Sequence, residues 1–326
     1  MKTINKKLAN LEQEINWLKR DKYRGVGEEV GSRVTRSNFA RRLESDISRL
    51  KAGEPLDYVI GWREFLGCKI DLSEKPLIPR EETEFWVGEA IKQIGNEKND
   101  LGQVDRGLPS VNLEVKPPSG DQLRGLASKL KVLDLFAGSG GIGLAVLKHC
   151  PNIEMTFGEK DPKLCEQIKK NLKLNGLKGR VIQTDIFQAY RSSTSISHSK
   201  LGIKSLKNPC LSESNLVKKS NLVKNLVKFD VIFANPPYVP ARRSSVQKSV
   251  KKFEPALALW GGACGLFFID KFLAEAQNYL KPGGRIFMEF GHGQKGAIEK
   301  LLKKYGYKNW QFKKDQFERW RYVVVE

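Results

Sequence analysis

The segment Asn235-Pro236-Pro237-Tyr238 places a carboxamide, two prolines and an aromatic ring directly after the apolar run 229–234. Two consecutive prolines remove two backbone N–H donors and fix φ at both positions, so the chain leaves its strand stiff. The Asn235 side-chain oxygen and the Pro236 carbonyl are acceptors that together can hold both hydrogens of a planar NH₂ group. The ring of Tyr238 can lie against a flat substrate. We therefore predict that Asn235, Pro236 and Tyr238 are catalytic, and that Pro237 contacts the substrate with them.

A second segment with chemical potential is DLFAGSGGIG at 134–143, which joins an apolar run to a helical pattern. Its glycines let the backbone turn tightly and approach a ligand. The segment lacks the Lys-Ser/Thr of a P-loop, and GSGGIG (138–143) matches the dinucleotide-binding pattern only as an isolated string. Asp134 disfavours an anionic phosphate and favours a cationic ligand. We therefore predict S-adenosylmethionine as the cofactor, because its amino group and sulfonium are positive.

The remaining cofactor contacts are expected where the next strands end. Glu159 lies at the end of the second strand, where a carboxylate can accept both ribose hydroxyls. Asp185, at the end of the third strand, either contacts the adenine or forms a turn. The predicted cofactor-binding residues are Asp134, Phe136, Gly138, Gly140, Glu159, Lys160, Asp185, Ile186 and Asn235.

The elements that must position these residues alternate along the chain from Lys131 onward. Strands are expected at 131–136, 154–160, 180–187, 229–234 and 285–290, with 309–312 and 321–325 as an antiparallel edge. Between them, helical patterns follow the glycine loop, start at an Asp161 N-cap with Pro162, and cover 266–280. This alternation predicts an α/β fold: a doubly wound, mostly parallel, seven-stranded sheet.

The chain divides into two predicted domains. Residues 1–75 are interpreted as a helical N-terminal substrate-recognition domain and linker, and 76–326 as the sheet domain. Two polar stretches, 96–128 and 188–228, have no clean period and are interpreted as flexible inserts.

Composition limits the partners and the compartment. The net charge of +20 suggests nucleic acid, but segment 188–228 alone holds eight basic residues and one acidic residue, so part of the excess lies in an insert. Five cysteines without a CxxC pair indicate reduced thiols in the cytoplasm, and no metal site. No run of 18 apolar residues and no signal peptide is present, which argues against a membrane. We expect a monomer, with weak ribosome or RNA contact through basic patches.

DLFAGSGGIG together with NPPY resembles the class I S-adenosylmethionine-dependent methyltransferases that act on planar amino groups. The flanking segments 54–72, 76–87, 254–268 and 313–325 are similar to the HemK/PrmC-type release factor glutamine methyltransferases. The resemblance covers residues 54–94, 131–187 and 229–326. It implies a Rossmann-like methyltransferase domain over 76–326, and methyl transfer to the side-chain amide nitrogen of the glutamine in the GGQ motif of peptide-chain release factors.

The resemblance also assigns substrate contacts outside NPPY. The IPREETE loop, 78–84, is expected to border the substrate pocket through Arg80, Glu82 and Thr83. Plain ion pairing is an equally good interpretation of the charged members. Glu81 stands where the family pattern IPRPxTE has a proline, so the loop is expected to be less rigid.

Two other functions remain open from the sequence. An RNA or DNA amino-methyltransferase with the same NPPY site would use the positive charge, including the basic residues after NPPY: Arg242, Arg243, Lys248, Lys251 and Lys252. A ribosome-associated binding module with a degenerate fold is the third interpretation. Intact Asp134, Glu159 and Asn235 argue against it.

Overall fold

A computed structural model describes residues 2–23, 33–100, 129–191, 226–241 and 246–326. Most of both predicted inserts, together with Arg242 and Arg243, lies outside the described residues. Several described residues at the start of each stretch belong to helices. Helix α4 continues to Asp100, and Gln188–Tyr190 form the short 3₁₀ helix η1. The insert boundaries expected at 96 and 188 are therefore wrong by a few residues.

The central sheet has seven strands in the order β5-β4-β3-β6-β7-β9-β8. The strands are β3 (Leu130–Leu135), β4 (Ile153–Glu159), β5 (Arg180–Gln183), β6 (Phe229–Ala234), β7 (Leu280–Glu289), β8 (Trp310–Lys314) and β9 (Trp320–Val325). The first five are parallel, and β9 runs antiparallel to both β7 and β8. The predicted doubly wound, mostly parallel, seven-stranded sheet is confirmed.

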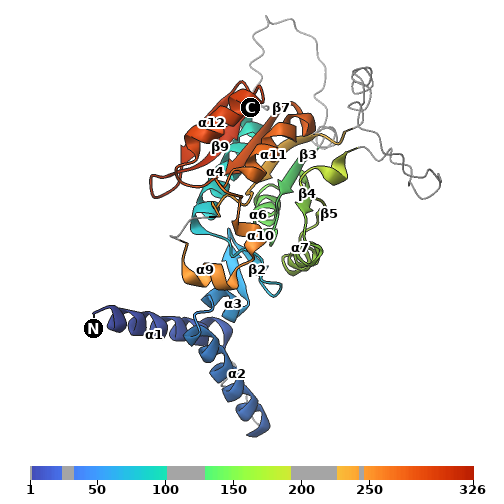
Figure 1. Ribbon diagram of the computed structural model, residues 1–326. Coiled ribbons are helices and arrows are strands. Elements are labelled where there is room, and N and C mark those ends of the chain that lie inside the picture. Colours follow the sequence, from blue (N-terminus) through green and yellow to red (C-terminus); the bar gives the residue numbers. More distant parts are fainter. Residues whose placement is uncertain (1, 24–32, 101–128, 192–225, 242–245) are drawn as a thin grey trace, which may run out of the picture.

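Helices cover both faces of this sheet (Figure 1). One face carries α4 (Glu81–Asp100), α6 (Gly141–His149) and α7 (Pro162–Leu174). The other carries η1, α11 (Phe267–Glu275), η5 (Ala276–Tyr279) and α12 (Lys295–Lys304). Alternate side chains of each strand serve the two layers: Val132 faces the α6 layer and Leu133 the α11 layer.

The N-terminal region is only partly helical, which corrects the expectation for residues 1–75. Helices α1 (Lys2–Lys22), α2 (Arg33–Lys51) and α3 (Leu56–Ile60) share a small core. The chain then forms a hairpin of β1 (Trp62–Phe65) and β2 (Cys68–Asp71). Leu66 and Gly67, at its turn, both have positive φ, as a two-residue hairpin requires. In Figure 1, α1 and α2 extend away from the sheet domain.

The topology fixes where a ligand can bind. Strand β3 is followed through α6 by β4 on one side, whereas β6 pairs with β3 on the other side. Ligands of open α/β sheets bind beyond the carboxyl ends of the strands at such a reversal. The glycine loop after β3 and the Asn235 segment after β6 therefore meet at this edge. Among the described residues, no helix has the length and apolar character needed to cross a membrane.

Candidate active site

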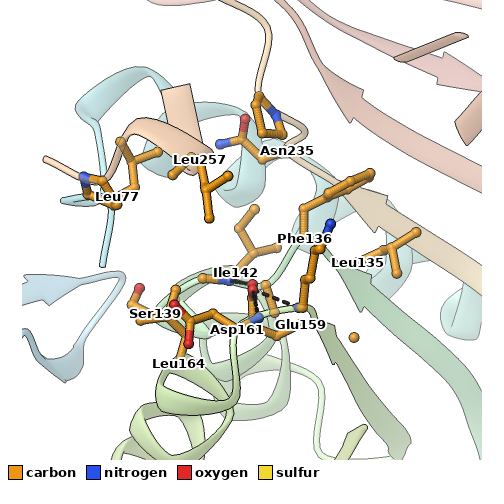
Figure 2. Close-up of a pocket in the computed structure, with 18 of the residues that line it drawn as sticks. Leu77, Leu135, Phe136, Ser139, Ile142, Glu159, Asp161, Leu164, Asn235 and Leu257 are labelled. Atoms are coloured by element: carbon orange, nitrogen blue, oxygen red, sulfur yellow. Dashed lines mark hydrogen bonds between the residues drawn. The ribbon is translucent and has the colours of Figure 1, made fainter. Parts of the chain in front are cut away.

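A cavity of about 450 Å³ opens at the carboxyl ends of β3, β4 and β6. This volume suits a small-molecule site. Figure 2 shows Asn235, Leu257 and Leu77 on one side of the cavity and Ser139, Glu159 and Asp161 on the opposite side. The cavity thus joins the segments after β3, β4 and β6 to the loop before α4 and to the short helix α10 (Ala256–Leu259).

The glycine loop presents backbone to the cavity. Gly138 lines it with a φ of 56°, and a Cβ at this position would meet no atom within 4 Å. Phe136 also lines it and has a φ of 63°, an uncommon conformation for a residue with a side chain. Gly140 does not line the cavity. It is the N-cap of α6, and a Cβ there would lie 3.2 Å from Ile168, so close packing rather than ligand contact explains this glycine.

Glu159 is held by three backbone N–H groups. Its Oε2 accepts from Gly138 at 2.8 Å, and its Oε1 accepts from Lys160 at 2.7 Å and from Asp161 at 2.9 Å. A carboxylate offers about four acceptor positions, so one on Oε2 remains for a ligand. The assignment of both ribose hydroxyls to this group stays a prediction. Burial raises the pKa of Glu159, and the three backbone donors oppose that rise.

Asp134 does not face the cavity, contrary to the sequence interpretation. Its position in β3 points the side chain toward the α6 layer, where it is fully buried. Its Oδ2 accepts a 2.8 Å hydrogen bond from Gly143 in the first turn of α6, and its Oδ1 has no hydrogen-bond partner among the described residues. Burial raises the pKa of Asp134 to about 7. The carboxylate therefore joins β3 to the N-terminus of α6 instead of contacting a cofactor.

The segment after β5 closes the far end of the cavity. Asp185 lines the cavity, two residues beyond the end of β5, and its carboxylate pairs with Lys160 at 2.8 Å. Ile186 also lines the cavity and has a φ of 54°. Both predicted contacts in this segment thus lie at the cavity, as does Lys160.

Asn235 lies at the cavity as predicted. Among the described residues its carboxamide has no hydrogen-bond partner within the protein. Pro237 also lines the cavity. Pro236 is buried and does not line it, so the second acceptor predicted from its carbonyl is not found at the cavity wall.

Tyr238 points away from the cavity, which corrects its assignment as a platform for the substrate. Its hydroxyl donates a 2.8 Å hydrogen bond to Glu289, at the end of β7. Its carbonyl accepts from the Gln294 side chain at 2.9 Å. Neither interaction could be read from the sequence, because the partners lie more than 50 residues further along the chain.

The loop before α4 and the first turn of α4 are anchored by side chains that reach four separate segments. Arg80 lines the cavity and pairs at 2.6 Å with Glu254, whose side chain is only 1% exposed. Thr83 also lines it and donates to Glu289. Glu82 lies outside the cavity lining and approaches Arg321 at 3.7 Å, so the ion-pair interpretation holds for it. Glu84 accepts from the backbone of Leu66.

Glu81, which replaces the proline of the family pattern, is the first residue of α4. An acidic side chain at a helix N-terminus is favourable, because it complements the partial positive charge of the first turn. With four other side chains of the segment anchored, the expected loss of rigidity is not seen.

Two glycines that the sequence analysis passed over shape the Asn235 segment. A Cβ on Gly261 would lie 2.5 Å from the Pro237 carbonyl oxygen, and one on Gly265 would lie 2.2 Å from the Tyr238 carbonyl oxygen. The segment 254–268, which carried part of the family resemblance, therefore packs directly against NPPY. Leu257, from the same segment, lines the cavity and is 76% exposed.

The cavity's ionisable side chains are Arg80, Glu159, Lys160, Asp161 and Asp185. Three are acidic, and both basic ones are ion-paired. These side chains fit S-adenosylmethionine. Its ammonium and sulfonium groups are positive, and its ribose hydroxyls donate hydrogen bonds that carboxylates can accept. The open backbone at Gly138 allows the ligand to approach.

This chain is similar to known methyltransferases. Residues 122–197 match the family model of the methyltransferase small domain. A release factor glutamine methyltransferase of Thermodesulfovibrio yellowstonii is 28% identical over 81% of this chain and 74% of that protein. One from Streptococcus pneumoniae is 28% identical over 90% of this chain and 82% of that protein. One from Geobacter sulfurreducens is 26% identical over 80% and 69%.

Fold, cavity and family match together define a methyltransferase that uses S-adenosylmethionine, as predicted. The more particular resemblance, to the release factor glutamine methyltransferases, is also confirmed and extends over most of the chain.

Proposed function

We propose that this protein methylates the side-chain amide nitrogen of the glutamine in the GGQ motif of peptide-chain release factors. The observation that carries the proposal is the Asn235 carboxamide, which lies at the cavity without a protein partner among the described residues. The names of the relatives support a release factor as the substrate.

Asn235 is suited to bind a primary amide. Its Oδ1 accepts an N–H of the substrate, while the two prolines behind it limit backbone motion. When bound, S-adenosylmethionine would supply an electrophilic methyl group to this amide. The amide nitrogen would gain the methyl group, the sulfonium would leave as a neutral thioether, and one amide N–H proton would pass to water. Because an amide nitrogen is a weak nucleophile, orientation is the main contribution that this site can make, and alignment contributes up to roughly 7–11 kcal/mol.

The walls around Asn235 favour a neutral side chain over a nucleotide. Leu77, Pro79, Pro255 and Leu257 give this part of the cavity an apolar surface. Arg80 is neutralised by Glu254, so no unpaired cation lines the cavity within the described chain. Among the described residues, which exclude Arg242 and Arg243, a phosphate entering with a nucleobase would find no unpaired cation at the cavity. The alternative of an RNA or DNA amino-methyltransferase is therefore not favoured.

A competition assay tests the proposal. The protein is incubated with S-adenosylmethionine carrying a labelled methyl group, a release factor and ribosomal RNA together. We expect label in the GGQ glutamine, located by peptide mass spectrometry, and none in the RNA. Label confined to the RNA contradicts the proposal.

Asn235→Ala tests the assigned residue. Loss of one preorganised polar contact lowers the catalytic rate roughly 100- to 1,000-fold, by analogy with oxyanion-hole deletions. Asn309→Ala removes an exposed carboxamide far along the chain and serves as the matched control. Equal rates for the two variants would remove Asn235 from the mechanism.

A further inference from the structure

Glu289 is a buried carboxylate that the reaction itself does not use. It is the last residue of β7 and is 1% exposed. Its Oε2 accepts hydrogen bonds of 2.7 Å from the Thr83 hydroxyl and from the Trp86 indole N–H. Its Oε1 accepts a 2.8 Å hydrogen bond from the Tyr238 hydroxyl. Burying a charge is costly unless it is hydrogen-bonded, and these three donors offset that cost.

The three donors come from two parts of the cavity wall. Thr83 and Trp86 belong to the first turns of α4, and Thr83 itself lines the cavity. Tyr238 belongs to the segment that begins with Asn235, which comes much later in the sequence than Thr83. Glu289 lies behind both and does not line the cavity. It therefore joins two walls of the site without touching a ligand.

The link from Tyr238 to Asn235 is stiff. Only two prolines separate the two residues, and proline has a fixed φ. The Tyr238 carbonyl is held as well, by the Gln294 side chain at 2.9 Å. Anchoring of Tyr238 therefore limits how far the backbone at Asn235 can move.

As the structure arranges them, the three donors use both carboxylate oxygens of Glu289 as acceptors. An indole N–H can only donate, so Oε2 must accept from Trp86. The ionised form of Glu289 satisfies this and also both hydroxyls. Burial raises the pKa of Glu289, while the three donors and the nearby charge of Arg321 oppose that rise. Glutamine at this position has the same size but no charge, and its NH₂ can pair with Tyr238 only if the hydroxyl turns from donor to acceptor.

We propose that Glu289 is a positioning residue. By fixing Tyr238, it holds Asn235 in place relative to Thr83 on the other side of the cavity. This proposal rests on the role given to Asn235 in the proposed function. Misplacement of a catalytic group by about 1 Å lowers a rate by about 100-fold. Loss of the Glu289 interactions is expected to act on the rate and not on cofactor binding, because Glu159 lies at the end of β4 and Gly138 in the loop after β3.

The test compares Glu289→Gln and Tyr238→Phe with the wild-type protein. The measurements are kcat and KM for the release factor, and the Kd for S-adenosylmethionine by calorimetry. We expect kcat to fall about 100-fold in Glu289→Gln and at least 10-fold in Tyr238→Phe, with the Kd changed less than twofold. The double variant is expected to be no slower than Glu289→Gln, because both changes break the same contact. Glu299→Gln, a change at a partly exposed position on α12, is the control.

Each outcome decides the proposal. Wild-type kcat in Glu289→Gln, or multiplying effects in the double variant, would overturn it. If Glu289→Gln does not fold, Tyr238→Phe still tests the proposal, because it removes one hydroxyl and keeps the ring. An unchanged kcat in Tyr238→Phe would overturn the positioning role of Glu289. If the wild-type protein methylates RNA and not the release factor, the proposed function fails. The same rate ratios measured on that RNA then test Glu289 separately.

Discussion

The carboxylate of Glu159, at the end of β4, accepts a 2.8 Å hydrogen bond from the backbone N–H of Gly138, in the loop after β3. One side chain therefore shapes the glycine loop and leaves an acceptor position open toward the cavity. The cofactor pocket depends on this pair, since the loop's own side chains contribute no such link.

Glu159→Ala is expected to weaken S-adenosylmethionine binding roughly 10- to 100-fold. Hydrogen bonds to a charged group contribute about 1.5–3 kcal/mol each, and the variant removes the ribose acceptor together with the support of Gly138. Calorimetry measures the Kd. Glu154→Ala, an exposed change on the same strand, is expected to bind normally. A Kd within twofold of wild type in Glu159→Ala would contradict this account of the pocket.

Gly261→Ala is expected to slow methyl transfer without weakening cofactor binding. The new Cβ would lie 2.5 Å from the Pro237 carbonyl oxygen, so the Asn235 segment must shift. A shift of this kind costs about 100-fold in kcat. Gly296→Ala is the control, because a Cβ there meets nothing within 4 Å and the position lies in α12, where alanine is favoured by up to about 1 kcal/mol. Steady-state kinetics compare the two variants, and equal kcat values would show that Gly261 is not needed for spacing.

Asn171→Ala is expected to weaken cofactor binding more than Asn175→Ala does. Both carboxamides, on or next to α7, hold the backbone of strand β2. Only Asn171 also donates to the Ser139 carbonyl, at 2.9 Å, and so supports the glycine loop. A net loss of about 1 kcal/mol per hydrogen bond predicts a Kd raised roughly 5- to 10-fold for Asn171→Ala alone. Identical Kd values for the two variants would show that Asn171 does not support the glycine loop.

Asp134 is expected to make the protein less stable as the pH rises from about 4 to 7. Its pKa is about 7 in the folded protein and 3.8 as the ordinary value, so the folded state holds a proton over this interval that the unfolded chain has released. The free energy of unfolding therefore falls across the interval and levels off above pH 7, by on the order of 4 kcal/mol in total.

Urea unfolding at several pH values between 4 and 8 checks this for the wild type and for Asp134→Asn. The variant cannot titrate at this position, so its curve is expected to lack this decline. The charge of Glu159 helps to raise the pKa of Asp134, so the difference between the two curves reports Asp134 together with this coupling. Parallel curves for the two proteins would show that Asp134 has an ordinary pKa.

Local patterns were sufficient to predict most of the fold and part of the site. Apolar runs and their spacing gave the strand β6 at Phe229–Ala234 and the antiparallel pair at the edge of the sheet. Asp161 with Pro162 gave the start of α7, where the Asp161 side chain caps the helix. Glu159 and Asn235 were found because one ends a strand and the other follows one, and parallel strands end at one edge. The hairpin at 62–71 was missed, because its short strands show little alternation within a region interpreted as helical.

The sequence by itself determined which segments meet at the cavity, because strand positions and short turn motifs are encoded locally and parallel strands end at one edge of a sheet. Only the tertiary structure decided which way the side chains in those segments point. Asp134 turns to the N-terminus of α6, and Tyr238 turns to Glu289, because the partners that satisfy their buried polar groups are supplied by other elements. The spacing of the Asn235 segment likewise depends on Gly261 and Gly265, whose close approach follows from packing and from no pattern in the chain.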